Sequence, residues 1–213
     1  MRAALTLPRT RLWVEFLVLF VGVPLVLAFA LPPTMMWNVL AAATFAGVVL
    51  LHYTPGFEWT TLLTGRFDWI AFLAFTLVTA AASFAAVMIW MPEQLLVLPR
   101  AVPQVWLGIM IAYPLVSAIP QELVFRPLFF RRYGDLLPAG SALWINAALF
   151  SLAHLMYRDP IVLSMTFAGG VAFAWAYHVR GSFPLACAMH AVAGCIIFTS
   201  GLGRLFYSGA VGG

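Results

Sequence analysis

Long apolar runs separated by short, proline-marked connections dominate the pattern of this sequence. Most runs reach the roughly 20 residues that an α-helix needs to cross the hydrocarbon core of a bilayer. Backbone groups in lipid must hydrogen-bond within the chain, and no alternating ten-residue pattern indicates a β-barrel, so the runs are predicted to be helices. We predict seven spanning segments, at 12–31, 34–51, 69–91, 105–130, 141–157, 161–179 and 183–201. The pattern therefore predicts an all-α, polytopic transmembrane helix bundle, with an eighth segment if the proline-rich stretch 92–104 also enters the membrane.

Composition supports a membrane protein and excludes an ordinary soluble domain. The chain is 64% hydrophobic and 8% charged, whereas typical soluble domains carry about 25% charged residues. All 11 basic residues are arginines, and they are scattered among the loops rather than gathered in a patch. This distribution is typical of membrane orientation and does not indicate nucleic-acid binding. With no repeat and no soluble stretch, residues 1–213 are predicted to form a single integral membrane domain.

The arginines also predict an orientation. If the N-terminus is cytoplasmic, the inner loops hold Arg2, Arg9, Arg11, Arg66, Arg131, Arg132 and Arg180, and the outer loops hold Arg100, Arg158 and Arg204. An arginine excess inside favours this arrangement. The first apolar run contains Ala28-Phe29-Ala30 and so also resembles a secretory signal, but its spanning length favours an uncleaved helix.

Three of the apolar segments carry ionisable residues. Segment 105–130 holds Glu122 and Arg126, segment 141–157 holds His154, and segment 183–201 holds His190. Ionisable groups within a membrane are costly and point to a functional site. At 1.5 Å per residue, Glu122, His154 and His190 lie roughly 15, 21 and 12 Å from the inner face. Helix tilt can absorb such differences, so we expect the three side chains to meet inside the bundle.

Glu122 and Arg126 are four residues apart and therefore share one helix face. They form either a structural ion pair or a pair in which Arg126 keeps Glu122 ionised and oriented. Pro120 and Pro127 predict a broken helix here. Glu122 would then lie near a helix start, which favours a carboxylate, and broken helices at membrane depth line cavities.

One carboxylate and two histidines suit two chemistries, and the sequence leaves both open. They can bind zinc as a His2Glu site with water in the fourth position. Alternatively, Glu122 acts as a general base in a metal-free site while His154 and His190 orient water or stabilise an oxyanion. The H-E-x-x-H pattern is absent. Asn146, two turns before His154, is a possible amide donor, although an interhelical hydrogen bond is the favoured interpretation.

The motifs on these three segments together resemble the CPBP family of CAAX-processing and bacteriocin-processing intramembrane proteases. That family carries E-E-x-x-x-R, F-x-x-x-H and H-x-x-x-N in this order on three membrane helices. The corresponding stretches here are Gln121-Glu122-x-x-x-Arg126, Phe150-x-x-x-His154 and His190-x-x-x-Gly194. The resemblance covers about residues 114–200, and the earlier part of the chain adds only helices.

The resemblance implies a glutamic-type endopeptidase that hydrolyses a peptide bond in a membrane-embedded or lipidated substrate, with no cofactor. The first glutamate of the motif activates water with help from both histidines, and the asparagine helps to hold the oxyanion. Here Gln121 replaces that glutamate and Gly194 replaces the asparagine. Neighbouring helical residues point about 100° apart, so Glu122 can act as the base only if the turn is shifted.

The alternative is a non-catalytic pseudoprotease that binds a membrane partner, which the substitutions at 121 and 194 favour. A proton-coupled transporter is a third class, but the sequence lacks the internal repeats that are usual in transporters.

Overall fold

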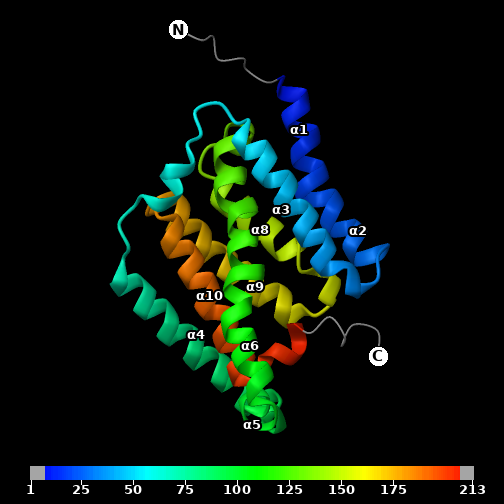
Figure 1. The fold of residues 1–213 in the computed structure, drawn as a ribbon, viewed down its shortest axis with the longest axis vertical. Coiled ribbons are helices and arrows are strands. Elements are labelled where there is room, and N and C mark those ends of the chain that lie inside the picture. Colours follow the sequence, from blue (N-terminus) through cyan, green and yellow to red (C-terminus); the bar gives the residue numbers. More distant parts are fainter. Residues whose placement is uncertain (1–7, 207–213) are drawn as a thin grey trace.

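The computed structural model describes residues 8–206, which fold into a helical bundle without any strand in that range (Figure 1). The predicted all-α architecture is confirmed. The α-helices are α1 (Arg9–Leu17), α2 (Val23–Phe29), α3 (Met36–His52), α4 (Trp69–Trp90), α5 (Val97–Ala101), α6 (Pro103–Tyr113), α7 (Ile119–Leu123), α8 (Ala142–Leu152), α9 (Pro160–Ala174) and α10 (Phe183–Ser200). The π-helical segments are η1 (Val18–Gly22), η5 (Pro114–Ala118), η6 (Val124–Tyr133) and η9 (Trp175–Val179). The 3₁₀ segments are η2 (Pro33–Met35), η3 (Trp59–Leu63), η4 (Pro92–Gln94), η7 (Gly134–Leu136), η8 (Leu155–Tyr157) and η10 (Leu202–Phe206).

Consecutive segments combine into helices long enough to cross a bilayer. In the described part of the chain six helices have the necessary length and apolar composition: Arg9–Phe29, Pro33–His52, Trp69–Trp90, Pro103–Leu136, Pro160–Val179 and Phe183–Ser200. Their outer faces remain strongly apolar; Ile70, for example, is 83% exposed. Large exposed apolar surfaces are unfavourable in water and natural in lipid. The protein is therefore an integral membrane protein.

The predicted fifth segment, 141–157, is present as the apolar helix Ala142–Tyr157, which is shorter than the six candidate spans. α8 ends at Leu152, and the short apolar helix closes with the 3₁₀ turn η8. The imidazole Nδ1 of His154 bonds the carbonyl of Phe150 at 2.8 Å, and the His154 backbone N–H donates to Ser151 instead. The side chain thus takes the acceptor that would continue the α-helix, which is a known way for a polar side chain to end one. The stretch 92–104 forms the short α5 and no additional span.

The long helix of residues 103–136 carries Glu122, and it is continuous where a break at Pro120 was predicted. Ala118, which precedes α7, has φ −65° and ψ −53°, so the backbone stays helical and Glu122 does not lie at a free helix start. The helix instead widens into π-turns that begin at Pro114 and enclose Pro127. Such local π-turns accommodate the missing proline N–H without breaking the helix.

Aromatic packing joins the first helix to the long helix. Phe16 and Phe20 are buried, and their rings lie 5.8 Å and 5.4 Å from the ring of Phe129. A second tight contact joins α8 to α9, where a Cβ on Gly170 would lie 3.0 Å from the Cα of Ala147. α10 packs between α4 and α9 in the bundle (Figure 1). These contacts place the interior faces of α8, α9 and α10 next to the middle of the long helix.

The loop arginines gather at opposite ends of the bundle as the predicted orientation requires. Arg132 pairs with Glu15 on α1 at 2.8 Å, and Arg180 pairs with Asp68, before α4, at 2.6 Å. At the other end Arg158 donates to the carbonyl of Ala28, at the end of α2, at 2.9 Å. These contacts group the loops into two sets; which set is cytoplasmic stays a prediction.

Candidate functional site

A buried ion pair lies at the centre of the candidate site. The side chains of Glu122 and Arg126 are both 0% exposed, and Arg126 Nε lies 2.8 Å from Glu122 Oε2. Arg126 Nη2 adds a second contact, at 3.3 Å, to Oε1. Glu122 and Arg126 therefore share one helix face, as predicted, and form a bidentate guanidinium–carboxylate pair. Buried charges are tolerated only when they are paired and hydrogen-bonded, and the geometry of this pair meets both conditions.

His190 on α10 binds the same carboxylate. Its Nδ1 lies 2.9 Å from Glu122 Oε1. A carboxylate that pairs with arginine only accepts hydrogen bonds, so Nδ1 carries a proton, and in this tautomer Nε2 is an acceptor. The hydroxyl of Tyr113 lies 3.1 Å from Nε2 and donates to it. The ring of Phe173 stacks on the imidazole of His190, with 4.8 Å between the ring centroids, and restricts its orientation further.

Asn146 and Phe150 on α8 support Arg126 from the other side. Arg126 Nη1 donates to the side-chain oxygen of Asn146, whose amide nitrogen donates to the carbonyl of Phe125 at 2.6 Å. The predicted interhelical hydrogen bond of Asn146 is thus present, and its amide is occupied. The ring of Phe150 lies 5.1 Å from the guanidinium carbon and 5.4 Å from the ring of His190, so Phe150 packs against both Arg126 and His190.

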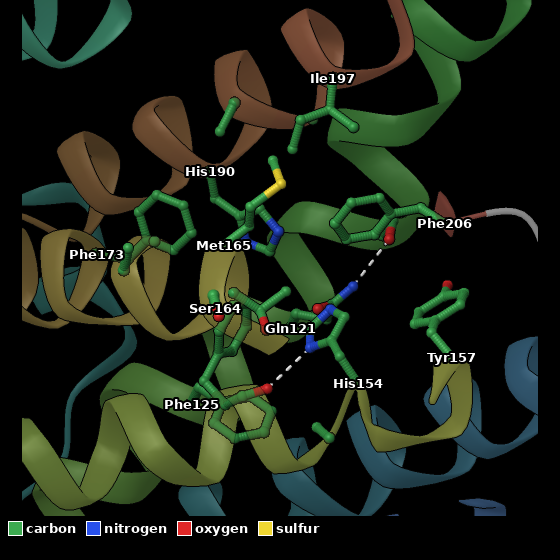
Figure 2. A pocket seen from close by; sticks show the side chains of 18 of the residues that line it. Gln121, Phe125, His154, Tyr157, Ser164, Met165, Phe173, His190, Ile197 and Phe206 are labelled. Atoms are coloured by element: carbon green, nitrogen blue, oxygen red, sulfur yellow. Dashed lines mark hydrogen bonds between the residues drawn. The ribbon is translucent and has the colours of Figure 1, made fainter. Parts of the chain in front are cut away.

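A large, mainly apolar cavity adjoins these groups. Its volume is about 890 Å³, near the upper end of the usual range for ligand pockets. Gln121, His154 and His190 line it (Figure 2), whereas Glu122 and Arg126 are not among its lining residues. Gln121 donates from its amide to Ser117 Oγ at 2.9 Å. The regular turn in α7 therefore directs residue 121 into the cavity and residue 122 away from it.

His154 faces the same cavity without joining the charged network. Its Nδ1 proton donates to the Phe150 carbonyl, which leaves Nε2 of the neutral ring as an acceptor. Figure 2 shows the ring beside Tyr157 and Phe206, whose rings lie 6.2 Å and 6.5 Å from it. Within residues 8–206 no hydrogen bond joins His154 to Glu122 or His190. The structure thus brings Glu122 and His190 into contact and places His154 on the wall of the cavity.

The predicted zinc alternative has no assembled ligand set. Among the residues that the structure describes, no group of three His, Cys, Asp or Glu side chains is placed to hold a metal ion. The physical reason is the donor geometry: Glu122 is occupied by Arg126 and His190, and His154 points elsewhere.

Two polar residues of the site were missed from the sequence. Tyr113 and Ser117 precede Gln121 by eight and four residues, and all three line the cavity. Their spacing on one helix face was a usable signal. It went unrecognised because neither residue is ionisable near neutral pH and neither belongs to the three motifs.

The fold and the site define an all-helical integral membrane protein with a buried carboxylate–histidine pair beside a large apolar cavity. Residues 103–196 match the family model for Rce1-like type II CAAX prenyl endopeptidases. This match confirms the resemblance to the CPBP family that the three motifs carry, and that family consists of intramembrane endopeptidases. The searches of curated proteins and of solved structures found no match.

Proposed function

We propose that this protein is an intramembrane endopeptidase in which His190 activates the hydrolytic water and Glu122 acts through His190. The observation that carries the proposal is the 2.9 Å contact between Glu122 Oε1 and His190 Nδ1. It fixes the tautomer whose Nε2 accepts a proton on the cavity side. A general base must lie within hydrogen-bond reach of the proton that it removes, and Nε2 meets this condition, whereas Glu122 does not line the cavity.

The chemistry balances with these residues alone. Water attacks the peptide carbonyl carbon while its proton moves to His190 Nε2, and the carbonyl π electrons move to oxygen. The negative charge of Glu122 stabilises the imidazolium that forms. When the intermediate collapses, the C–N bond breaks and the proton passes from Nε2 to the leaving amine. His154, with an acceptor Nε2 on the same cavity, orients the water.

The cavity favours a lipidated peptide as substrate. Its walls are formed largely by aliphatic and aromatic side chains of α2, α3, α4 and α9, including Leu27, Val39, Val78 and Met165. Such a lining suits a hydrocarbon chain, while the peptide lies against Gln121 and the histidines. The matched family, whose description names CAAX prenyl endopeptidases, supports a prenylated C-terminal peptide.

The test is cleavage of a farnesylated peptide ending in a CAAX motif by purified protein in liposomes. Mass spectrometry measures release of the C-terminal fragment. We expect cleavage by the wild type, loss of cleavage in His190→Ala, and wild-type rates in His178→Ala, whose ring stacks on Phe130 outside the cavity. Folded wild-type protein that leaves the peptide intact would refute the proposal.

A second function, a non-catalytic binding protein, is favoured by one observation. The cavity position next to the ion pair is held by Gln121, whose amide cannot act as a base. This candidate predicts that a photoreactive farnesylated peptide crosslinks to the wild type but is never cleaved. Crosslinking accompanied by turnover would eliminate it.

We also infer that the end of the bundle that holds Arg132 and Arg180 faces the cytoplasm, so that the N-terminus lies inside. The arginine distribution supports this orientation. Accessibility of an N-terminal tag to protease in intact and in permeabilised cells tests it; cleavage of the tag in intact cells would reverse the orientation.

A further inference from the structure

Gly194, on α10, lies four residues after His190 and faces Tyr113 across the helix interface. Glycine within a helix typically costs about 0.5–1 kcal/mol relative to alanine, so its presence needs a packing reason. A Cβ at this position would overlap the Tyr113 ring and lie 2.6 Å from its hydroxyl oxygen. The tyrosine therefore occupies the space that any side chain at position 194 would need.

The Tyr113 ring is held firmly in that space. It packs edge-on against Phe198 at 5.6 Å and against His190 at 6.0 Å. Its hydroxyl ends at the cavity wall, 3.1 Å from His190 Nε2. A neutral hydroxyl is thus presented directly beside the nitrogen that takes the proton in the proposed reaction.

The two side-chain amides near this point already donate hydrogen bonds within the protein. The Gln121 amide donates to Ser117, and the Asn146 amide donates to the Phe125 carbonyl. The Tyr113 hydroxyl is different, because its acceptor is His190 Nε2. In the proposed reaction this nitrogen accepts a hydrogen bond from water in place of Tyr113. As water hydrogen-bonds to Nε2, the hydroxyl of Tyr113 becomes free to turn toward the carbonyl oxygen of the bound peptide.

We propose that Tyr113 is a catalytic residue whose hydroxyl donates the hydrogen bond that stabilises the oxyanion, and that Gly194 is required to admit its ring. The inference rests on the proposed peptidase function. It assigns to Tyr113 the role that the absent asparagine at position 194 leaves open. The hydroxyl proton stays on Tyr113 throughout, so the proton balance of the reaction is unchanged.

The first test is Tyr113→Phe in the farnesyl-peptide assay. Loss of one oxyanion donor typically lowers kcat about 10²–10³-fold. We expect a fall of this size in kcat with little change in KM, because the donor acts on the transition state. Tyr53→Phe, at the exposed end of α3 and outside the cavity, is the matched control and keeps the wild-type kcat.

The second test exchanges the two positions. Gly194→Asn alone displaces the Tyr113 ring and lowers activity, and Tyr113→Ala alone removes the donor. In the double variant Tyr113→Ala/Gly194→Asn the ring is gone and the new amide shares a helix face with His190. We expect at least tenfold higher kcat in the double variant than in Tyr113→Ala. If the double variant does not fold, the kcat of Tyr113→Phe decides.

The outcomes separate this inference from the proposed function. Wild-type cleavage that persists at an unchanged kcat in Tyr113→Phe overturns the role of Tyr113 and leaves the peptidase proposal intact. A folded wild type that does not cleave overturns both. A fall in kcat without rescue by Gly194→Asn overturns the assignment of position 194 as the space for the donor.

Discussion

Breaking the buried pair of Glu122 and Arg126 should be far more costly than breaking an exposed pair of the same chemistry. The perturbation is Arg126→Met, which removes the charge and retains much of the apolar volume. It leaves the Glu122 carboxylate with His190 as its remaining partner and deprives the Asn146 oxygen of a donor. Removing one member of a buried pair typically costs about 3–5 kcal/mol.

Arg180→Met is the matched control. Its guanidinium pairs with Asp68 at 2.6 Å, but the Arg180 side chain is 48% exposed, against 0% for Arg126. Exposed pairs contribute about 0–1 kcal/mol because water screens them. The same chemical change is therefore expected to differ by at least about 2 kcal/mol between the two positions.

A double-mutant cycle separates the pair from its surroundings. Glu122→Gln leaves Arg126 buried without its counter-charge and should also cost about 3–5 kcal/mol. The double variant Glu122→Gln/Arg126→Met removes both charges, and the new amide can still accept from His190. We therefore expect its cost to fall short of the two single costs combined by about 2 kcal/mol or more.

The assay is unfolding by increasing SDS in detergent micelles, followed by far-UV circular dichroism and tryptophan fluorescence. The measured quantity is the change in the free energy of unfolding between variants. A cost for Arg126→Met no larger than that for Arg180→Met, or strict additivity in the cycle, would refute the reasoning. Either result would mean that the two charges do not stabilise each other inside the bundle.

Three further predictions concern packing, hydrogen bonding and pH. Gly170→Leu should lower the thermal midpoint because its Cβ would lie 3.0 Å from the Cα of Ala147; Gly108→Leu, with no atom within 4 Å, is the control in a thermal melt. Asn146→Leu should lower the free energy of unfolding by about 1–3 kcal/mol, because two buried hydrogen bonds are lost. Asn38→Leu, at an exposed position, is the control and should change that free energy by less than about 0.5 kcal/mol. Equal costs of the two substitutions in SDS unfolding would contradict the role of Asn146. The backbone N–H of Ala71, together with Arg180, lowers the pKa of Asp68. The stabilising effect of the Asp68 carboxylate is therefore present above the unfolded pKa of about 3.9 and is lost as the pH falls through the lower, folded pKa. Thermal melts of the wild type and Asp68→Asn should differ at pH 7 and converge in acid, and a difference in midpoint that stays constant with pH would contradict this.

The helices were predictable from the sequence because lipid leaves the backbone few alternatives. Six predicted spans correspond to long apolar helices in the described residues. The fifth segment is a shorter helix than the other six, and the predicted break at Pro120 was wrong, both for local reasons that hydropathy does not report. The His154 side chain hydrogen-bonds the Phe150 carbonyl and so ends the α-helix. Near Pro114 and Pro127 the helix forms π-turns, which accommodate the prolines without a break.

Contacts within one helix were more predictable than contacts between helices. The pairing of Glu122 with Arg126 follows from their spacing, and the structure shows it. The contact between Glu122 and His190 depends on the rotation of α10 against α7, which spacing along the chain does not contain. Spacing along the chain likewise could not decide whether His154 contacts the Glu122 carboxylate or only lines the cavity.

The two departures from the family motifs have a different meaning once they are placed in space. Taken separately, Gln121 removes a base and Gly194 removes a donor, and each weakens the case for an enzyme. In the structure Gln121 shares a cavity-facing helix side with Tyr113, and Gly194 provides the space that Tyr113 occupies. The two positions thus belong to one wall, on which the Tyr113 hydroxyl and the imidazole of His190, held by Glu122, lie next to each other. On this wall the Tyr113 hydroxyl and His190 Nε2 lie 3.1 Å apart, and the proposed mechanism uses the first for oxyanion binding and the second for water activation. Cleavage by the wild type therefore distinguishes an enzyme from a binding protein, and the kcat of Tyr113→Phe then tests whether the hydroxyl on this wall takes part in the reaction.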